Sequence, residues 1–492
     1  MRRVLIANRG EIAVRIARAC HEAGLEAVAV YSDVDRGAPH TLAADRAVAI
    51  GPAPAVQSYL KIDALLAAAK SAGADAVHPG YGFLAESAAF ARAVEAAGLT
   101  WIGPPPGAIA TMGDKLAARA AVTRAGVPLV PGADVADARE AARRADALGY
   151  PVLVKAAAGG GGKGMRTVAR EADLPDALAA ARREAESAFG DGRVYLEKLL
   201  VRPRHVELQV LGDRHGTVVH LGERECSIQR RHQKIVEETP CPVVTARLRE
   251  EMASAALAAA RAVGYTSAGT VEFLLDADGH FYFLEMNTRV QVEHPITELV
   301  TGIDIVAAQL RIAAGERLGF AQDDVRARGH AIEARLYAED PAASFFPSAG
   351  PILALREPGG PGIRVDSGVA AGMVVPVEYD PLLAKISAWG PDRATAIARL
   401  SAALADTAVL GPTTNLGFLL DVLAHPAFHA GDTHTGFLPE HFPAWHQPDG
   451  DATIAAIAAA LALSRPSGAG DAHGPAATPT PWETLGAWRL GS

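Results

Sequence analysis

The first hundred residues alternate short apolar runs with segments of helical periodicity, and this alternation constrains the possible folds more than any other feature of the chain. Strands that alternate with helices form parallel sheets, because each crossover between parallel strands needs a helix on one face of the sheet. The pattern therefore predicts an α/β region with a doubly wound parallel sheet. Its expected strands are 4–7, 27–31, 75–78 and 100–103, and its expected helices are 10–23, 59–71 and 86–97.

The rest of the chain departs from this alternation. From Met112 to about residue 330, strand-like segments follow one another closely and are predicted to pair antiparallel. The next region mixes strands with a helix at 393–406, which is typical of an α+β domain. After an Ala-rich helix at 452–463, a stretch rich in Pro, Gly and Ala is expected to be a flexible linker. The expected divisions of the chain are 1–112, 113–330, 331–445 and 446–492.

Composition and charge exclude several classes of protein. The 492 residues are 49% hydrophobic and 21% charged, which fits a globular protein rather than a disordered or fibrous one. The net charge of −9 gives no general attraction to nucleic acid or anionic membranes, and no apolar run approaches the ~18 residues of a membrane span. The N-terminal residues do not resemble a signal peptide, and the three scattered cysteines suit a reducing compartment. We therefore expect a cytoplasmic protein that binds neither nucleic acid nor membrane.

The segment 269–289 is predicted to be a β-hairpin that carries acidic side chains. Its Asp278-Gly279 dipeptide is typical of a two-residue type I′ turn, and counting back from that turn places Glu272 opposite Glu285. Their Cβ atoms would lie about 5 Å apart, where two carboxylates repel by about 3 kcal/mol unless a cation lies between them. Asn287 shares their face, and this set of oxygen ligands favours Mg²⁺ or Mn²⁺ bound with nucleotide phosphates. A turn displaced by one residue, or a protonated glutamate, would remove the site.

The run GGGGKGM (159–165) suggests phosphate binding, but not through a Walker A loop. Gly164 stands where that loop needs Ser or Thr, and Ala157 stands where it needs its first glycine. Strands are expected on both sides of the run, so we predict a lid loop whose backbone N–H groups close over a polyphosphate. Lys155, on the preceding strand, would add a positive charge. A plain flexible hairpin loop is the simpler alternative.

The motif TRVQVEHPITE (288–298) places three polar side chains at alternate positions. In an extended chain, Arg289, Gln291 and Glu293 would share one face and present a guanidinium for a small planar anion, an amide, and a carboxylate able to act as a base. Surface strands show the same alternation, so the pattern alone does not identify a site.

Three other motifs each leave two interpretations open. RHVELQV (204–210) suits the floor beneath a ligand or a half-exposed strand, and SIQRRHQK (227–234) suits an anion pocket or a solvated basic face, without the aromatic residues of a nucleic-acid patch. NRGEIA (8–13) has one glycine where a dinucleotide fingerprint needs three, so an ordinary strand-to-helix turn is favoured over NAD binding.

Only eight of the 47 basic residues are lysines, and three of these look ordinary: Lys61, Lys70 and Lys385.

Together these motifs resemble those of the biotin carboxylases, which belong to the ATP-grasp superfamily. They occur in the family's order and spacing over about residues 1–445: IANRGEIA, HPGYGFLAE, IGP, MGDK, GGGGKGM, RHVELQV, CSIQRRHQK and EMNTRVQVEHPITE. EARLYAEDP (333–341) and FPSAG (346–350) resemble the α subunits of acetyl-, propionyl- or methylcrotonyl-CoA carboxylases. Ala158 is one departure, because the family often has the first glycine of its run there.

The resemblance implies a role for each division of the chain. Residues 1–112 would be a pre-ATP-grasp domain, 113–330 an ATP-grasp domain with a mobile lid at about 127–201, and 331–445 the C-terminal domain of a biotin carboxylase. In the tail, PWETLGAWRL (481–490) resembles the start of the segment that follows this domain in α subunits. This leaves open whether the chain is full length or the N-terminal part of a longer polypeptide.

The resemblance also implies roles for individual residues. ATP would be held by one group of side chains and amides: Lys115, Lys155, Gly161, Gly162, Glu197, Lys198, Leu199, Leu200, His205, Gln229, His232 and Glu272. The metal positions of the family coincide with Glu272, Glu285 and Asn287. Bicarbonate and biotin would be bound by a second group: Lys234, Arg289, Gln291, Val292, Arg335 and Tyr81. Beside this group, Glu293 would deprotonate bicarbonate, and Arg335 would face the ureido group of biotin. Lys234, Arg289, Glu293 and Arg335 would be the catalytic residues.

The implied activity is the first half-reaction of an acyl-CoA carboxylase. ATP would activate bicarbonate as carboxyphosphate, whose breakdown would deliver CO₂ to N1′ of biotin. No lysine is adjacent to a methionine in this sequence, so biotin is expected on a separate carrier protein or domain. A carboxyltransferase subunit is expected as a second partner, and the enzyme as a homodimer or larger assembly.

Two alternatives belong to other classes. Another ATP-grasp ligase, such as a carbamoyl-phosphate or purine-pathway enzyme, would share the lid and the metal hairpin but not TRVQVEHP or the segment around Arg335. A catalytically silent nucleotide-binding subunit would tolerate the loss of Arg289 or Glu293, and both are present.

Overall fold

The computed structural model describes residues 1–157 and 165–447. All the helices and strands described belong to one structural unit, Met1–Trp445. The predictions for Gly161, Gly162, the helix at 452–463 and the linker lie outside the described residues. Within the described ranges, each helix is either too short or too polar to cross a bilayer.

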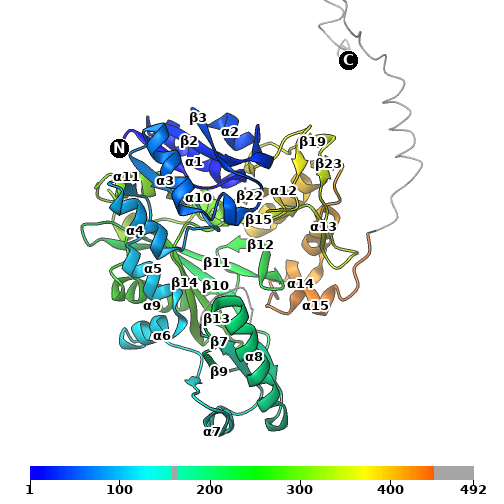
Figure 1. Ribbon diagram of the computed structural model, residues 1–492. Helices are drawn as coiled ribbons and strands as arrows, with labels where there is room; N and C mark the ends of the chain where they lie inside the picture. Colours follow the sequence, from blue (N-terminus) through cyan, green and yellow to red (C-terminus); the bar gives the residue numbers. More distant parts are fainter. Residues whose placement is uncertain (158–164, 448–492) are drawn as a thin grey trace, which may run out of the picture. The chain divides into compact units, whose positions relative to one another are not determined.

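The N-terminal region forms the predicted parallel sheet (Figure 1). Its strand order is β3-β2-β1-β4-β5, and helices lie between the strands in the chain. Val4 and Ile6 of β1 pack against α1, whereas Leu5 packs with residues of α3 and α4, so both faces of the sheet are covered. The elements are β1 (Arg3–Ile6), α1 (Gly10–Glu22), β2 (Glu26–Ser32), α2 (Pro39–Ala43), β3 (Arg46–Gly51), α3 (Ile62–Ala72), β4 (Ala76–His78), α4 (Ala88–Ala96) and β5 (Thr100–Trp101).

The alternation of the sequence does not predict β3, which lies at the edge of this sheet. Most of its six residues are exposed or half-buried. An edge strand of this kind needs few apolar residues, so its apolar signal in the sequence is weak.

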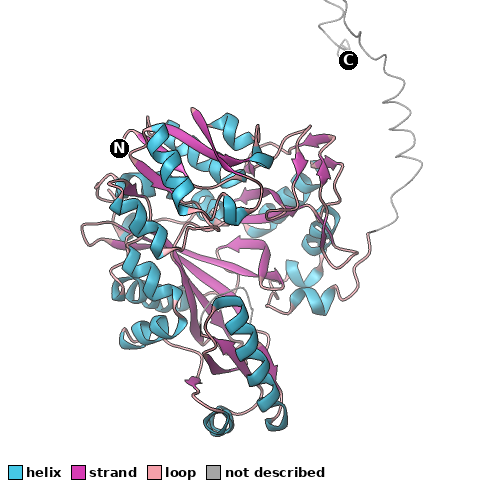
Figure 2. Ribbon diagram, in the orientation of Figure 1, coloured by secondary structure: helices cyan, strands magenta, loops and turns pink. Residues whose placement is uncertain are grey.

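A second, four-stranded sheet contains the glycine run. Its strands pair antiparallel in the order β6-β9-β7-β8, and β7 and β8 flank the run as expected. Figure 2 shows the two helices α7 and α8 beside these strands. We call this segment the lid; its elements are β6 (Gly132–Asp134), α7 (Ala138–Leu148), β7 (Val152–Ala156), β8 (Arg166–Val168), α8 (Leu174–Phe189) and β9 (Val194–Lys198).

The largest sheet has eight strands in the order β14-β13-β10-β11-β12-β15-β22-β20, with antiparallel pairing throughout. It continues from the second region of the chain into the third, because β12 pairs with β15. The expected division at residue 330 thus falls at the first residue of β15, within one continuous sheet. The strands are β10 (Arg204–Gly212), β11 (Val218–Arg230), β12 (Gln233–Thr239), β13 (Ser267–Leu275), β14 (Phe281–Asn287), β15 (His330–Tyr337), β20 (Ile363–Ser367) and β22 (Leu382–Gly390).

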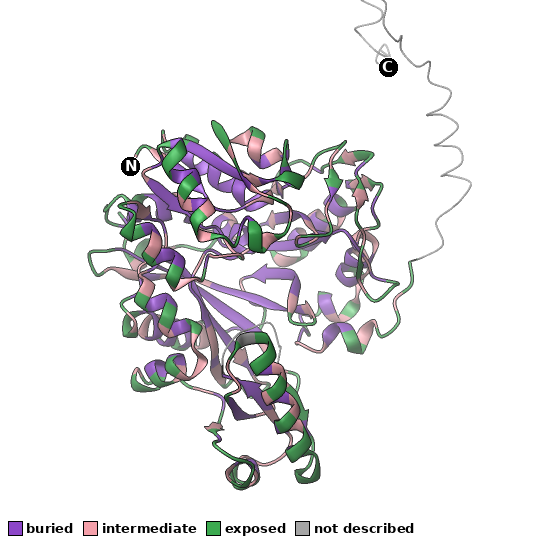
Figure 3. Cartoon of the chain, viewed as in Figure 1, coloured by how far each residue is buried: buried purple, intermediate pink, exposed green. Residues whose placement is uncertain are grey.

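The two faces of this sheet differ in polarity. Val206, Leu208 and Val210 of β10 pack into an apolar core with α9, whereas His205, Glu207 and Gln209 lie on the other face. All of these residues are buried, so β10 is not the half-exposed strand of the simpler interpretation. Figure 3 shows the central strands of the large sheet as mostly buried. The remaining helices are α5 (Pro106–Gly113), α6 (Lys115–Arg124), α9 (Ala246–Ala262), α10 (His294–Thr301), α11 (Ile305–Ala313), α12 (Arg393–Asp406), α13 (Leu416–Ala424), α14 (Pro426–His429) and α15 (Phe437–His441). Short strand pairs complete the third region: β16 (Glu339–Asp340) with β17 (Phe346–Pro347), β18 (Gly350–Pro351) with β21 (Val374–Val375), and β19 (Ala354–Arg356) with β23 (Ala408–Leu410).

The β13–β14 hairpin has the predicted pairing of Glu272 with Glu285, although its turn differs from the prediction. Asp276, rather than Ala277, bonds back to His280, and Gly279 adopts a φ of 85°. This arrangement fits a three-residue loop with glycine in the left-handed position. A bulge between Glu272 and Phe273 then shifts the register by one residue and restores the expected pair.

Candidate active site

One cavity collects the described residues of the predicted nucleotide site. It has a volume of about 470 Å³ and lies between the lid and the large sheet. Apolar side chains that the sequence analysis did not single out form much of its wall: Val130, Leu153, Met165, Leu274 and Leu284. The predicted residues that line it are Lys115, Lys155, Glu197, Lys198, Leu199, Leu200, His205, Gln229, His232, Glu272 and Glu285. Its apolar walls and convergent polar groups are typical of a small-molecule site.

Two lysines bring positive charge to this cavity. Lys155 Nζ lies 2.6 Å from Glu197 Oε2, and Arg119 binds the other oxygen of that carboxylate at 2.6 Å. Burial opposes the charge on Lys155, but Glu197 outweighs it and raises the lysine pKa. Burial and the charge of Lys155 together lower the pKa of Lys115. An anionic ligand would relieve the repulsion between the two ammonium groups.

Glu272 and Glu285 bring negative charge to the other side of the cavity. Burial and the neighbouring Glu272 raise the pKa of Glu285. Burial also opposes ionisation of Glu272, but Lys234 and His205 outweigh it and hold the pKa of Glu272 well below its usual range. His205 Nε2 lies 3.0 Å from Glu272 Oε2, and Asn287 Nδ2 donates to Glu272 Oε1 at 2.8 Å. A buried carboxylate (Glu272) and a half-buried one (Glu285), with an amide beside them, form a donor set that fits Mg²⁺ or Mn²⁺.

A buried cluster of charges adjoins this acidic pair. Lys234 Nζ donates to three carboxylates: Glu207 at 2.5 Å, Glu293 at 2.7 Å and Glu272 at 2.8 Å. Arg335 binds the second oxygen of Glu293 at 3.0 Å and also binds Glu237. Burial disfavours the charged form of Glu293, but Lys234 and Arg335 outweigh it and lower its pKa. In this structure Glu293 is therefore a stabilised carboxylate.

The structure corrects the extended conformation considered for residues 288–293. β14 ends at Asn287, and Glu293 lies in a turn directly before α10. The side chains still reach the site: Arg289 binds Glu86 at 3.0 Å and Asn287 Oδ1 at 2.9 Å, and Gln291 Nε2 donates to Glu272 at 2.9 Å.

Arg224, which the sequence motifs did not single out, lies beneath this turn and is fully buried. Its guanidinium donates to the Glu207 carboxylate at 2.6 Å and to Gln291 Oε1 at 2.6 Å. Three other acceptors complete its surroundings: Gln209 at 2.9 Å, Thr297 at 2.9 Å and Thr270 at 3.2 Å. Five bonds to a planar guanidinium fix the orientation of the Gln291 amide. The only sign of such an arginine in the sequence is the segment GERECS (222–227), where Arg224 stands between two glutamates.

Lys385, which looks ordinary in the sequence, is fully buried. Its Nζ donates to the carbonyl oxygen of Val292 at 2.7 Å and lies 3.1 Å from Glu11 Oε1. The hydroxyl of Tyr81, a predicted substrate residue, donates to the same Glu11 oxygen. The interpretation of Lys385 as ordinary is therefore wrong.

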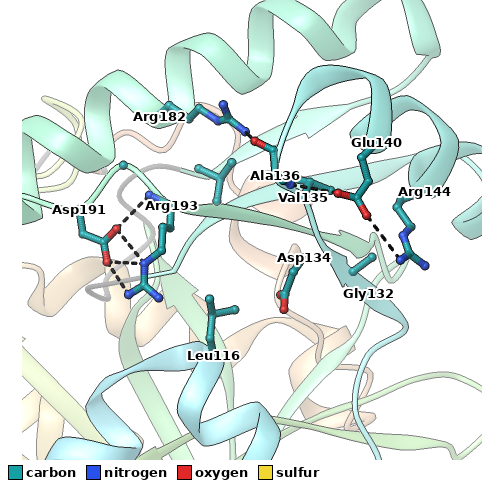
Figure 4. Close-up of a pocket in the computed structure, with 13 residues that line it drawn as sticks. Leu116, Gly132, Asp134, Val135, Ala136, Glu140, Arg144, Arg182, Asp191 and Arg193 are labelled. Carbon is teal, nitrogen blue, oxygen red and sulfur yellow. Dashed lines mark hydrogen bonds and ion pairs between the residues drawn. The ribbon is translucent and has the colours of Figure 1, made fainter.

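A second cavity, of about 860 Å³, lies against β6 in the lid (Figure 4). Its arginines are already bound within the protein: Arg144 to Glu140, Arg182 to the carbonyl of Ala136, and Arg193 to Asp191. It therefore offers a polyphosphate less uncompensated charge than the cavity around Lys115 and Lys155.

Comparisons with known proteins match successive parts of the chain to domains of related enzymes. Three family models match it: "Biotin carboxylase, N-terminal domain" over residues 1–109, "Carbamoyl-phosphate synthase L chain, ATP binding domain" over 114–321, and "Biotin carboxylase C-terminal domain" over 333–440. A biotin carboxylase of Nostoc sp. is 51% identical over 440 residues, which cover 89% of this chain and 98% of that protein. The mitochondrial methylcrotonoyl-CoA carboxylase subunit alpha of Dictyostelium discoideum is 47% identical over 494 residues, which cover 99% of this chain and 70% of that protein.

A solved structure has the same fold. It is the biotin carboxylase domain dimer of Hydrogenobacter thermophilus 2-oxoglutarate carboxylase, in complex with MgADP, ADP and bicarbonate. The similarity has a TM-score of 0.86 at 47% sequence identity and covers 89% of this chain and 97% of that one. The chain described here therefore belongs to the biotin carboxylase family.

Proposed function

We propose that the cavity and the adjoining charge cluster divide the work of an ATP-dependent biotin carboxylase. ATP occupies the cavity, and bicarbonate and biotin react beside Glu293 and Arg335. This division is supported by the position of Lys234, whose ammonium lies within hydrogen-bond distance of both Glu272 and Glu293. It joins the acidic pair that faces the nucleotide to the carboxylate proposed as the base.

The nucleotide is bound by apolar contact and by charge. Leu153, Leu274 and Leu284 line a slot for the base, and Lys115 and Lys155 attract the phosphates. Glu272, Glu285 and Asn287 would hold Mg²⁺ or Mn²⁺. When bound, this ion neutralises charge that develops on the phosphates during transfer.

Bicarbonate binds between Lys234, Arg289 and Gln291. An anion that pairs with the Lys234 ammonium weakens the contact that most favours ionised Glu293. The pKa of Glu293 therefore rises, and the carboxylate becomes a better base. Glu293 then takes the proton of bicarbonate, whose oxygen attacks the γ-phosphorus of ATP and displaces ADP. The carboxyphosphate that forms breaks down to phosphate and CO₂.

Biotin receives the CO₂ at N1′. Arg335 lies on β15 with its guanidinium against Glu293, where it can stabilise negative charge on the ureido oxygen as N1′ gives its proton to the phosphate released from carboxyphosphate. A biotin carrier protein or domain and a carboxyltransferase are the proposed partners, in keeping with the carboxylase subunit among the relatives.

The assembly, the location and the domain divisions are further parts of the proposal. A homodimer is proposed, since the related 2-oxoglutarate carboxylase domain is described as a dimer. The cytoplasmic location rests on the three free, buried cysteines of the described residues. The divisions at residues 112, 330 and 445 lie close to the limits of the matched family models.

ATP turnover with and without bicarbonate and free biotin tests this function. Bicarbonate should stimulate ATP hydrolysis, and free biotin should raise it further. ATP hydrolysis that does not depend on bicarbonate, or that instead requires an amine donor, would favour another ATP-grasp ligase.

A further inference from the structure

The motif NRGEIA and the lysine at position 385 are not used by the proposed mechanism, yet the structure joins them. Glu11, from the motif, lies on α1, and Lys385 lies on β22. Their side chains form an ion pair in the interior, with Nζ 3.1 Å from Oε1. The Lys385 and Glu11 side chains are 0% and 2% exposed. Tyr81, from the segment after β4, donates its hydroxyl to the same oxygen of Glu11.

The far end of this arrangement is the backbone of the turn at residues 290–293, which we call the bicarbonate turn. Lys385 Nζ donates to the Val292 carbonyl oxygen at 2.7 Å, a charge-assisted bond stronger than one between neutral groups. Because the peptide unit is planar, the direction of this carbonyl also sets the direction of the Glu293 N–H and the position of the Glu293 Cα. Lys385 thereby fixes the residue that is proposed as the base.

Side chains next to the turn hold two of its other carbonyls. Arg289 donates to the Val290 carbonyl at 3.3 Å, and His294 Nδ1 lies 2.7 Å from the Gln291 carbonyl. The Val292 carbonyl is bound by a residue 93 positions away in the chain. This contact therefore ties the turn to the large sheet.

The surroundings of Lys385 balance its charge. Arg335 on β15 and Asp366 on β20 are its direct neighbours across the sheet. Its charge favours the ionised forms of Asp366, which Arg364 also binds at 2.8 Å, and of Glu333. Among the described residues, the carboxylate in ion-pair contact with the ammonium is Glu11, at 3.1 Å. A compact ammonium on a flexible stem can reach both Glu11 and a carbonyl, whereas the planar fork of arginine is larger.

We propose that Glu11 and Lys385 form a strut that positions the bicarbonate turn, so that bicarbonate use depends on residues outside the bicarbonate site itself. The proposal rests on the function proposed above for Gln291 and Glu293. Tyr81 belongs to the strut through its bond to Glu11.

The test is a single and a double variant, compared in thermal stability and in the KM for bicarbonate. Lys385→Met leaves Glu11 buried without its cation and should lower the Tm. The double variant Glu11→Gln/Lys385→Met removes both charges and should recover most of that loss. It still lacks a donor for the Val292 carbonyl, so its KM for bicarbonate should stay raised about ten-fold or more, with the KM for ATP near that of the wild type. Lys70→Met, at an exposed position of α3, is the matched control and should change neither constant.

Each outcome distinguishes the strut from simple stabilisation. A double variant that recovers both its Tm and its bicarbonate KM would make the pair a structural contact only and overturn the proposal, as would an equal rise in the KM for ATP. If the lysine variants do not fold, Glu11→Gln alone should raise the bicarbonate KM by a smaller factor, and an unchanged value would overturn the strut. A wild-type protein without bicarbonate-stimulated turnover would overturn the proposed function and the strut together, whereas normal wild-type turnover with unaffected variants would overturn the strut alone.

Discussion

Lys234 and Glu293 form a buried ion pair, with Nζ 2.7 Å from Oε1, and the same ammonium binds Glu272 of the acidic pair at 2.8 Å. The contact joins the cavity assigned to ATP to the carboxylate assigned as the base. A ligand that competes for this lysine changes the charge felt at both places.

Glu293→Gln tests the assignment of the base. The amide keeps the volume and one acceptor for Lys234 but cannot take a proton. Bicarbonate-dependent turnover should fall by about 10²-fold or more, while the ATP affinity measured by equilibrium binding stays near that of the wild type. A variant that loses ATP binding yet turns over normally at saturating ATP would assign Glu293 to the nucleotide instead.

Glu285→Gln tests the metal position. Because burial and Glu272 raise the pKa of Glu285, removal of its charge should leave the Tm unchanged or higher. ATP turnover should fall, most strongly at limiting Mg²⁺. Full activity at limiting Mg²⁺ would contradict the assignment of Glu285 as a ligand.

Arg224→Met tests how much the hydrogen bonds of the buried Arg224 guanidinium stabilise the fold around the site. The change leaves Glu207 and the oxygen of Gln291 without their bonds to the guanidinium, so the free energy of unfolding should fall by about 3–5 kcal/mol. Denaturant unfolding measures this loss. Arg247→Met, at an exposed position of α9, is the control and should stay within about 0.5 kcal/mol of the wild type. Equal losses in the two variants would contradict the buried role of Arg224.

Glu333 makes stability depend on pH. Burial raises its pKa to about 8 from an ordinary value of 4.5. The folded protein therefore holds a proton that the unfolded chain releases, and this group's contribution to stability is lost as the pH rises from about 4.5 to about 8. In Glu333→Gln the Tm should fall less over that range than in the wild type. Parallel Tm curves for the two proteins would show that Glu333 is ionised in the fold.

The sequence predicts the parallel sheet, the lid strands and the Glu272–Glu285 pair, because each depends on local patterns of apolar residues and turns. The turn of the hairpin is nevertheless displaced by one residue, and a bulge next to Glu272 restores the pairing. A bulge has no local signature here, so its position could not be inferred. Lys385 and Arg224 escape prediction for a different reason. Their partners Val292 and Gln291 lie 93 and 67 positions away, and only the assembled sheet brings them into contact.

Trapping of labelled bicarbonate tests directly whether this chain carboxylates biotin with the groups assigned to it. Purified protein is incubated with ATP, Mg²⁺, free biotin and radiolabelled bicarbonate, and acid-labile carboxybiotin is isolated. The reaction should proceed slowly, because free biotin lacks the proximity that a tethered carrier provides. It should also survive deletion of residues 464–492, since all the assigned groups, including the Glu11–Lys385 pair, lie before residue 464. Label recovered only as CO₂, or loss of carboxybiotin on deletion of that tail, would contradict the account.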